Sequence, residues 1–187
     1  MGLEAARPDV WDDPLDLWHG TTDDSAWSVL SGLSLDCCFR AADFGPGFYA
    51  TTSREQALMW ASHQARRRGG GMGIVAFRVP RSALLGLRCS LFVRGDRDAD
   101  DYWRMVFCCR AGGFHGVGGA ADQPYDVVAG PVARSFSRWS EREAYQVYDQ
   151  WSFHTLAALR ILDGGDKCGW ISQKGAWIPM AQLSTPA

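Results

Sequence analysis

Several features that would assign the chain to a whole class of protein are missing from its sequence. No apolar stretch is long enough to span a bilayer, so we expect no membrane-spanning helix. The net charge of −2 gives no general positive field that would hold the protein on nucleic acid. The N-terminal residues are acidic and lack the apolar centre of a secretory signal. We therefore predict a cytoplasmic location, in a target cell if the protein is delivered as a toxin.

Paired metal-binding cysteines are also missing. The six cysteines include no C-x-x-C spacing, so no metal site is predicted, and reduced thiols in a cytoplasm fit best. Large apolar side chains are abundant, with nine tryptophans and nine phenylalanines among 187 residues that are 47% hydrophobic. This content supports a single domain over residues 1–187, with its core at about residues 15–163.

Hydrophobic patterns predict many short strands and a few small helices, which indicates an α+β fold. Strands are expected at residues 15–19, 48–51, 74–79, 125–130, 150–155 and 174–180. Helices are expected at residues 26–30, 54–67, 102–110 and 156–162, with N-caps at 22–25 and at Ser53. The segment 84–93 is ambiguous, and the glycines of 112–119 predict a flexible loop.

Four blocks occur in a fixed order along the chain. They are L-W-H-G-T-T at residues 17–22, D-F-G-P-G-F-Y-A-T-T at 43–52, Y-D-V-V-A-G-P-V-A at 125–133 and Y-D-Q-W-S-F-H-T at 148–155. Each block alone is a weak signal, but the ordered set resembles the bacterial ADP-ribosyltransferase superfamily of the histidine–tyrosine–glutamate type. It is most similar to a small toxin-like bacterial family of that superfamily, formerly described as of unknown function. The resemblance spans about residues 18–162 and implies a split β-sandwich of two small sheets with flanking helices.

The resemblance implies a role for each residue of a site that binds NAD⁺. His19 corresponds to the histidine that hydrogen-bonds the adenosine ribose, and Gly20 to the glycine whose backbone holds the nicotinamide amide. Tyr49 corresponds to the tyrosine that stacks on nicotinamide, since a flat π face suits a planar cationic ring. Without the other blocks, His19 would be interpreted as a core histidine at the end of a strand, and Tyr49 as a core tyrosine with an exposed hydroxyl.

Three further residues are expected to contribute to the cofactor site. Thr21 follows the glycine of the first block, and Gly47 lets the second block fold tightly over the cofactor. Thr51, together with Thr52, is a candidate for orienting the residue of the last block by hydrogen bonding. An ordinary turn is the alternative interpretation of the glycines in the second block.

The last block departs from the superfamily pattern. Gln150 stands where the superfamily usually has its catalytic glutamate. A glutamine can hydrogen-bond the nicotinamide ribose, but it has no charge and cannot act as a base. The departure favours a single transfer over chain elongation, and on this view Gln150→Glu should preserve or raise nicotinamide release. The alternative is a polar residue at a strand edge.

Other polar residues are weaker candidates. Glu141 and Glu143 resemble the E-x-E of arginine-specific members, but the segment is interpreted as exposed helix with solvated charges. Asp126 lies in an apolar strand and is expected to be structural, because a buried carboxylate needs partners. Arg110, at the end of a W-x-x-x-F-x-x-R block, is expected to pair with Asp126 or to contact pyrophosphate. His154 is expected to be an ordinary surface or core histidine.

Taken together, the sequence predicts a mono-ADP-ribosyltransferase that transfers ADP-ribose from NAD⁺ to a macromolecule and releases nicotinamide, as a bacterial toxin would. No metal is expected to take part. The acceptor is a protein or a nucleic acid, and an antitoxin or immunity protein is a further expected partner. The alternatives are an NAD⁺ glycohydrolase, with water as the acceptor, and a catalytically inactive NAD⁺-binding module. The run of arginines at 66–68 is the one feature that favours a nucleic-acid acceptor.

Overall fold

The computed structural model describes residues 13–36, 38, 41–113, 124–135, 137–173 and 175–183. The strands are β1 (Leu15–Thr22), β2 (Phe48–Ala50), β3 (Met72–Val79), β4 (Cys89–Leu91), β5 (Val127–Ser135), β6 (Glu143–Phe153), β7 (Asp166–Gln173) and β8 (Ala176–Pro179). The helices are α1 (Asp23–Ser31), α2 (Arg54–Arg68), α3 (Asp100–Arg110) and α4 (Leu156–Gly164), with 3₁₀ turns η2 (Arg81–Leu84), η4 (Trp139–Glu141) and η5 (Met180–Gln182).

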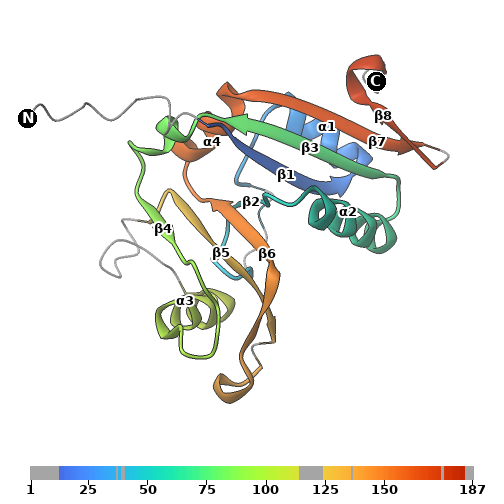
Figure 1. Ribbon diagram of the computed structural model, residues 1–187. Helices are drawn as coiled ribbons and strands as arrows, with labels where there is room; N and C mark the ends of the chain where they lie inside the picture. Colours follow the sequence, from blue (N-terminus) through green and yellow to red (C-terminus); the bar gives the residue numbers. More distant parts are fainter. Residues whose placement is uncertain are drawn as a thin grey trace, which may run out of the picture.

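The strands of the described residues form two four-stranded sheets, in the orders β1-β3-β7-β8 and β2-β6-β5-β4 (Figure 1). Neighbouring strands are antiparallel, except that β4 runs parallel to β5. The two sheets meet at one isolated bridge, in which Trp18 of β1 exchanges backbone hydrogen bonds of 2.7 and 2.9 Å with Thr51, just after β2. The predicted α+β fold with two small sheets and flanking helices is confirmed.

Two hydrophobic clusters hold these layers together. The larger cluster combines side chains of both sheets with α1 and α4, and includes Leu17, Phe48, Phe77, Phe153 and Leu159. The second cluster packs α3 against the other face of the sheet that contains β2 and β6. Figure 1 shows α3 beside β4 and β5, away from the first sheet. The β2-β6-β5-β4 sheet is therefore covered on both faces, and side chains that alternate along its strands enter two different environments.

The helix starts follow the predicted capping chemistry. Thr22 caps α1 by accepting from the backbone N–H of Ser25 at 3.4 Å, and Ser53 caps α2 by accepting from Gln56 at 3.2 Å. The basic residues in the last turn of α2 interact favourably with the negative end of the helix dipole. No helix among the described residues is long and apolar enough to cross a membrane.

The structure also corrects several expected elements. Strand β7 was not predicted at all, and β6 begins at Glu143 within a segment expected to be an exposed helix. The ambiguous segment 84–93 begins at the last residue of η2 and contains β4. Most of the glycine loop predicted at 112–119 lies outside the described residues.

The packing of α2 on β1 requires a glycine at position 20. A Cβ added at Gly20 would fall on the backbone carbonyl of Ala57 and lie 2.9 Å from the backbone nitrogen of Ala61. Gly20→Ala should therefore force α2 away from β1 and lower the free energy of unfolding by about 1–3 kcal/mol, as overpacking of a core does. Thermal and urea unfolding monitored by circular dichroism measure the change.

Gly164→Ala is the matched control, because nothing lies within 4 Å of the added Cβ at the end of α4. This variant should be as stable as the wild type, or more stable by about 0.5–1 kcal/mol, because alanine restricts the unfolded chain. Equal stability of Gly20→Ala and Gly164→Ala would show that α2 does not need the glycine.

Candidate functional site

The ring of His19 is held in one tautomer by the backbone of β2. Its Nδ1 lies 2.6 Å from the carbonyl oxygen of Tyr49, and because a carbonyl only accepts, Nδ1 must carry the proton. The ring also stacks on Phe48, with centroids 4.5 Å apart. Burial lowers the pKa of His19, and the hydrogen bond to Tyr49 opposes this only in part. The ring is therefore neutral near pH 7, and its Nε2 is an acceptor that no described residue uses.

Gly20 presents its peptide groups at the edge where the two sheets separate. The N–H and C=O of Trp18 point away from β3, because they bond to Thr51. Peptide groups alternate between the two edges of a strand, and β1 pairs with β3 without a bulge, so those of Gly20 point the same way as those of Trp18. Gly20 lies beyond the bridge, and no described residue bonds to its peptide groups on that side. This edge therefore offers a backbone donor and acceptor beside His19.

Tyr49 joins β2 to the loop before it. Its hydroxyl donates to the carbonyl of Gly45 at 2.8 Å and accepts from the N–H of Phe44 at 3.0 Å. The half-buried ring packs against the second cluster, and burial raises the pKa of the hydroxyl, so Tyr49 stays protonated. Since the side chain of Phe48 enters the first cluster, Tyr49 and its neighbour face opposite sides of the sheet. The hydroxyl of Tyr49 therefore has a structural function, because it holds the backbone of the preceding loop.

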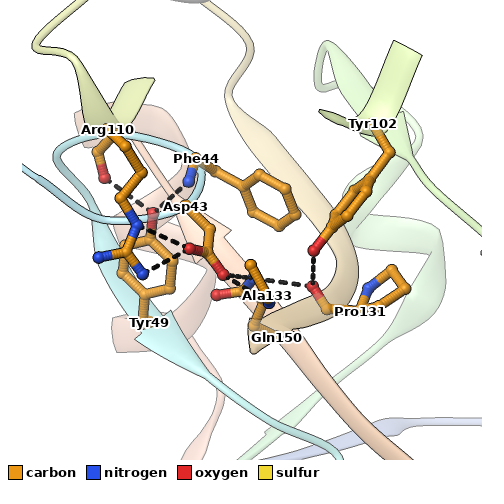
Figure 2. A network of polar contacts seen from close by, with 9 residues as sticks. Asp43, Phe44, Tyr49, Tyr102, Arg110, Pro131, Ala133 and Gln150 are labelled. Carbon is orange, nitrogen blue, oxygen red and sulfur yellow. Dashed lines mark hydrogen bonds and ion pairs between the residues drawn. The ribbon is translucent and has the colours of Figure 1, made fainter. Parts of the chain in front are cut away.

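Gln150 lies in a buried network around a carboxylate, drawn in Figure 2. Its Nε2 donates to Asp43 Oδ2 at 2.7 Å and to the carbonyl of Pro131 at 2.8 Å. Arg110 donates to Asp43 Oδ1 at 2.8 and 2.6 Å, and the N–H of Ala133 donates to Oδ2 at 2.9 Å. Two acceptors around Nε2 fix the orientation of the amide, which leaves Oε1 without a donor among the described residues.

The threonines after β2 bind the neighbour of Gln150. Thr51 Oγ1 donates to Asp149 Oδ1 at 2.5 Å, and Thr52 Oγ1 donates to Oδ2 at 2.9 Å. Gln56 of α2 also donates to the backbone carbonyl of Asp149 at 2.8 Å. The pair was predicted to orient the residue of the last block, and it holds that part of β6 through Asp149.

Gly47 and Thr21 have packing functions in the structure. A Cβ at Gly47 would lie 2.7 Å from Nδ1 of His154, which bonds to the carbonyl of Pro46 at 2.7 Å. Nε2 of the same imidazole lies 2.8 Å from the hydroxyl of Ser152, so His154 connects the loop before β2 to the end of β6. Thr21 is buried in β1, opposite Gly73 of β3.

The structure brings the predicted residues into one region but onto two faces of the β2-β6-β5-β4 sheet. His19 packs on Phe48 on the side of the first cluster, whereas Tyr49 and the partners of Gln150 belong to the side covered by α3. Tyr49 connects both sides, since its carbonyl accepts from His19 and its hydroxyl holds the loop that carries Asp43. The side chains of the three predicted site residues therefore do not line a single wall.

Sequence reasoning missed the function of Asp43. Arg110 pairs with Asp43 rather than with Asp126, which was one of its two expected partners. Asp126 is bound by Arg88 and by the hydroxyl of Thr155, the latter at 2.6 Å. Burial raises the pKa of Asp126, but the hydrogen bonds from Arg88 and Thr155 outweigh it, so this carboxyl is ionised well below neutral pH. For Asp43, the available signal was its position directly before the large apolar side chain of Phe44 in a loop.

Glu141 and Glu143 are exposed, as predicted, and each lies beside an arginine. Glu141 lies 3.3 Å from Arg138, and Glu143 lies 3.2 Å from Arg134. Among the described residues, no group of three or more histidine, cysteine or acidic side chains is arranged to hold a metal ion.

Comparison with known proteins gives one match. A family model described as "Protein of unknown function (DUF3990)" matches residues 15–137, about two thirds of the chain. The chain belongs to this family. The DUF3990 match includes His19, Gly20, Tyr49 and both charged partners of the buried network, and it ends before β6 and Gln150. No curated protein and no solved structure gave a significant match.

Gln150→Glu should destabilise the protein in a way that depends on pH. The introduced carboxyl would lie where the amide now contacts Asp43 Oδ2, so repulsion and burial would raise its pKa above that of an unfolded glutamate. A group with a raised folded pKa loses stability as pH rises through that value. At about pH 8 the variant should lose about 3–5 kcal/mol relative to wild type, as an uncompensated buried charge does, and clearly less at about pH 5.

Urea unfolding at both pH values measures this difference. Gln150→Met is the matched control, because it keeps the length of the side chain and loses both hydrogen bonds without adding a titratable group. Its stability relative to wild type should not change between the two pH values. A Gln150→Glu variant as stable as wild type at both would contradict the placement of Gln150 beside Asp43. The sequence alone predicted that Gln150→Glu would preserve or raise nicotinamide release, whereas the buried position beside Asp43 predicts a loss of stability.

Proposed function

We propose that this DUF3990 protein binds NAD⁺ and transfers its ADP-ribose to a macromolecular acceptor with release of nicotinamide. The observation that carries the proposal is the pairing of a neutral His19, whose Nε2 accepts from no described residue, with the peptide groups of Gly20 that point away from β3. A ribose hydroxyl is the donor that such an imidazole nitrogen accepts. A primary amide such as that of nicotinamide has N–H donors and a carbonyl acceptor side by side, which match the C=O and N–H of a single residue.

The second support is the ordered set of blocks that resembles the histidine–tyrosine–glutamate ADP-ribosyltransferases. In this proposal His19 and Gly20 hold the substrate beside the edge strand β2. The nicotinamide contacts the ring of Tyr49, which lies on the other face of the sheet, by extending around that edge. The hydroxyl of Tyr49 takes no part, because it is bound to the loop at 44–45. Gln150 contributes Oε1 as an acceptor for a ribose hydroxyl, and its nitrogen stays bound to Asp43.

The reaction breaks the bond between the anomeric carbon of the ribose and the nicotinamide nitrogen. The nicotinamide leaves as a neutral molecule with the electron pair of that bond, and an acceptor atom forms the new bond to carbon while losing a proton to solvent. An amide cannot take that proton, so an acceptor that is already a good nucleophile is favoured. Oε1 of Gln150 carries partial negative charge and is held rigidly, which stabilises positive charge that develops on the ribose.

A second candidate function is an NAD⁺-binding module without turnover. It is favoured by the position of Gln150, since the nearest carboxylate, that of Asp43, is bound by Arg110 and Ala133. Binding and release of nicotinamide therefore need separate measurements.

His19→Ala should weaken NAD⁺ binding by about 1–3 kcal/mol, the cost of leaving a buried hydroxyl of the ligand without its partner. Isothermal titration of NAD⁺ into wild type and variant measures the loss, with circular dichroism as the check on folding. His63→Ala is the matched control, because His63 is an exposed histidine on α2, stacked on Trp60. NAD⁺ binding that is equal in all three proteins would refute the site.

Gln150→Ala should lower the rate of nicotinamide release by about 10²-fold or more, since one preorganised acceptor is lost. The measurement uses NAD⁺ labelled in the adenosine, with and without a cell lysate, at matched concentrations of folded protein. Label in macromolecules supports the transferase, free ADP-ribose indicates a glycohydrolase, and binding without any release supports the module without turnover. Full activity of Gln150→Ala would place the catalytic residue elsewhere, with Asp149 the next to test.

A further inference from the structure

The outer face of α2 carries an exposed surface that is both aromatic and basic. The side chains of Met59 and Trp60 are 46% and 54% exposed, and the ring of Trp60 stacks on His63 with centroids 5.2 Å apart. Arg66 and Arg67 follow His63 by one helical turn, and all five residues lie at spacings that share one side of a helix. The opposite side of α2 packs on β1, so this surface faces away from the core.

The surface continues onto β6. The hydroxyl of Tyr148 lies 3.4 Å from the sulfur of Met59, and the ring of Tyr145 lies 5.1 Å from that of Tyr148. The guanidinium of Arg134 lies over the ring of Tyr145, 5.8 Å from its centroid. We call the continuous surface from Arg67 on α2 to Arg134 on β5 the α2–β6 strip. It has aromatic rings in its middle and arginines at both ends.

The charge of the strip differs from that of the whole chain. Two of the four arginines of α2, Arg66 and Arg67, lie on the strip, whereas the chain as a whole has a net charge of −2. Among the ion pairs of the described residues, none includes Arg66 or Arg67, and both are exposed. Arg134 is partly neutralised by Glu143 at 3.2 Å, so the positive charge is concentrated at the α2 end. The complementary occupant is therefore an anion.

The aromatic rings decide which anion fits. An acidic peptide would use the arginines and leave the exposed faces of Trp60 and Tyr145 without a partner. Single-stranded nucleic acid uses both, because its bases stack on aromatic side chains while its phosphates contact arginine. A duplex keeps its bases stacked inside and offers the rings nothing comparable. Stacking also explains why large aromatic groups are exposed in a chain that buries Trp103 and Tyr102 completely.

We infer that the α2–β6 strip binds single-stranded nucleic acid, with bases on Trp60, Tyr148 and Tyr145 and phosphates on the arginines of α2. Tyr148 lies two residues before Gln150 on β6, so a strand bound along the strip leads toward the proposed site of transfer. The bound strand is then the acceptor of ADP-ribose. This second step rests on the proposed function, whereas binding to the strip does not.

The test uses the full chain and fluorescein-labelled oligo(dT) and oligo(U) of about twelve nucleotides, a length typical of single-strand binding surfaces. Fluorescence anisotropy should show binding that weakens with salt. Trp60→Ala should weaken binding about tenfold through the loss of one stacked base, and Trp60→Phe should recover most of it. The double variant Arg66→Gln/Arg67→Gln should reduce the slope of log K against log salt by about 1.4, as expected for two lost phosphate contacts.

The controls remove an exposed apolar side chain and two exposed arginines elsewhere on the surface. Leu85 is 84% exposed and lies outside the strip, so Leu85→Ala should bind like wild type. Arg104→Gln/Arg138→Gln removes two exposed arginines outside the strip and should leave the salt slope unchanged. Stronger binding of a duplex or of polyglutamate than of either oligonucleotide, or equal effects of strip and control variants, would overturn the inference.

The same proteins separate this inference from the proposed function. Trp60→Ala should release nicotinamide to water at the wild-type rate but should transfer less label to the oligonucleotide. Oligonucleotide binding without any NAD⁺ binding would reject the proposed function and leave the strip intact. Label that reaches protein in a lysate, with no oligonucleotide binding, would retain the transferase and reject the strip. Comparison of oligo(dT) with oligo(U) tells DNA from RNA.

Discussion

A carboxylate removed from water must be matched by donors, and the structure around β6 is organised by this requirement at Asp43. The side chain of Asp43 is 3% exposed, and donors from α3, β5 and β6 converge on it. Removing one of these donors leaves one oxygen of a buried carboxylate with fewer partners, which costs more than the hydrogen bond itself contributes. The carboxylate therefore fixes the loop before β2, the end of α3 and the amide of Gln150 relative to one another.

Tyr49 transmits this constraint to the other side of the sheet. Its hydroxyl is held by the loop that contains Asp43, and its carbonyl sets the tautomer of His19. A single residue of a three-residue strand thus connects the ionic network to the imidazole. The acceptor nitrogen of His19 and the acceptor oxygen of Gln150 are prepared by the same local structure, although they belong to different faces.

Local patterns in the sequence predicted much of the fold. The caps at Thr22 and Ser53, the length of α2 and the strand cores near residues 74–79 and 127–130 follow from nearest-neighbour chemistry. Strand β7 was missed because its sequence, D-K-C-G-W-I-S-Q, is polar at both ends and has a glycine in the middle. Its pairing with β3 overrides that weak local preference.

The partners in the site were out of reach of sequence patterns. Asp43 and Gln150 are 107 residues apart, and Asp43 and Arg110 are 67 apart, so only the folded chain decides which charges meet. The pattern did name His19, Gly20, Tyr49 and Gln150, but it did not reveal that they face two sides of a sheet. Register across β2 and β6 sets these faces, and register is a tertiary property.

The lone bridge between Trp18 and Thr51 has a consequence for how this scaffold varies. Since the described residues of the two sheets share only this pair of backbone hydrogen bonds, the separation between the sheets beyond the bridge is set by the volume of side chains such as Phe48 and Phe153. The distance between β1 and β2 beyond Trp18 therefore depends on core packing rather than on strand pairing. Substitution of such a core residue should change the spacing of the sheets and leave every pair of hydrogen-bonded strands intact.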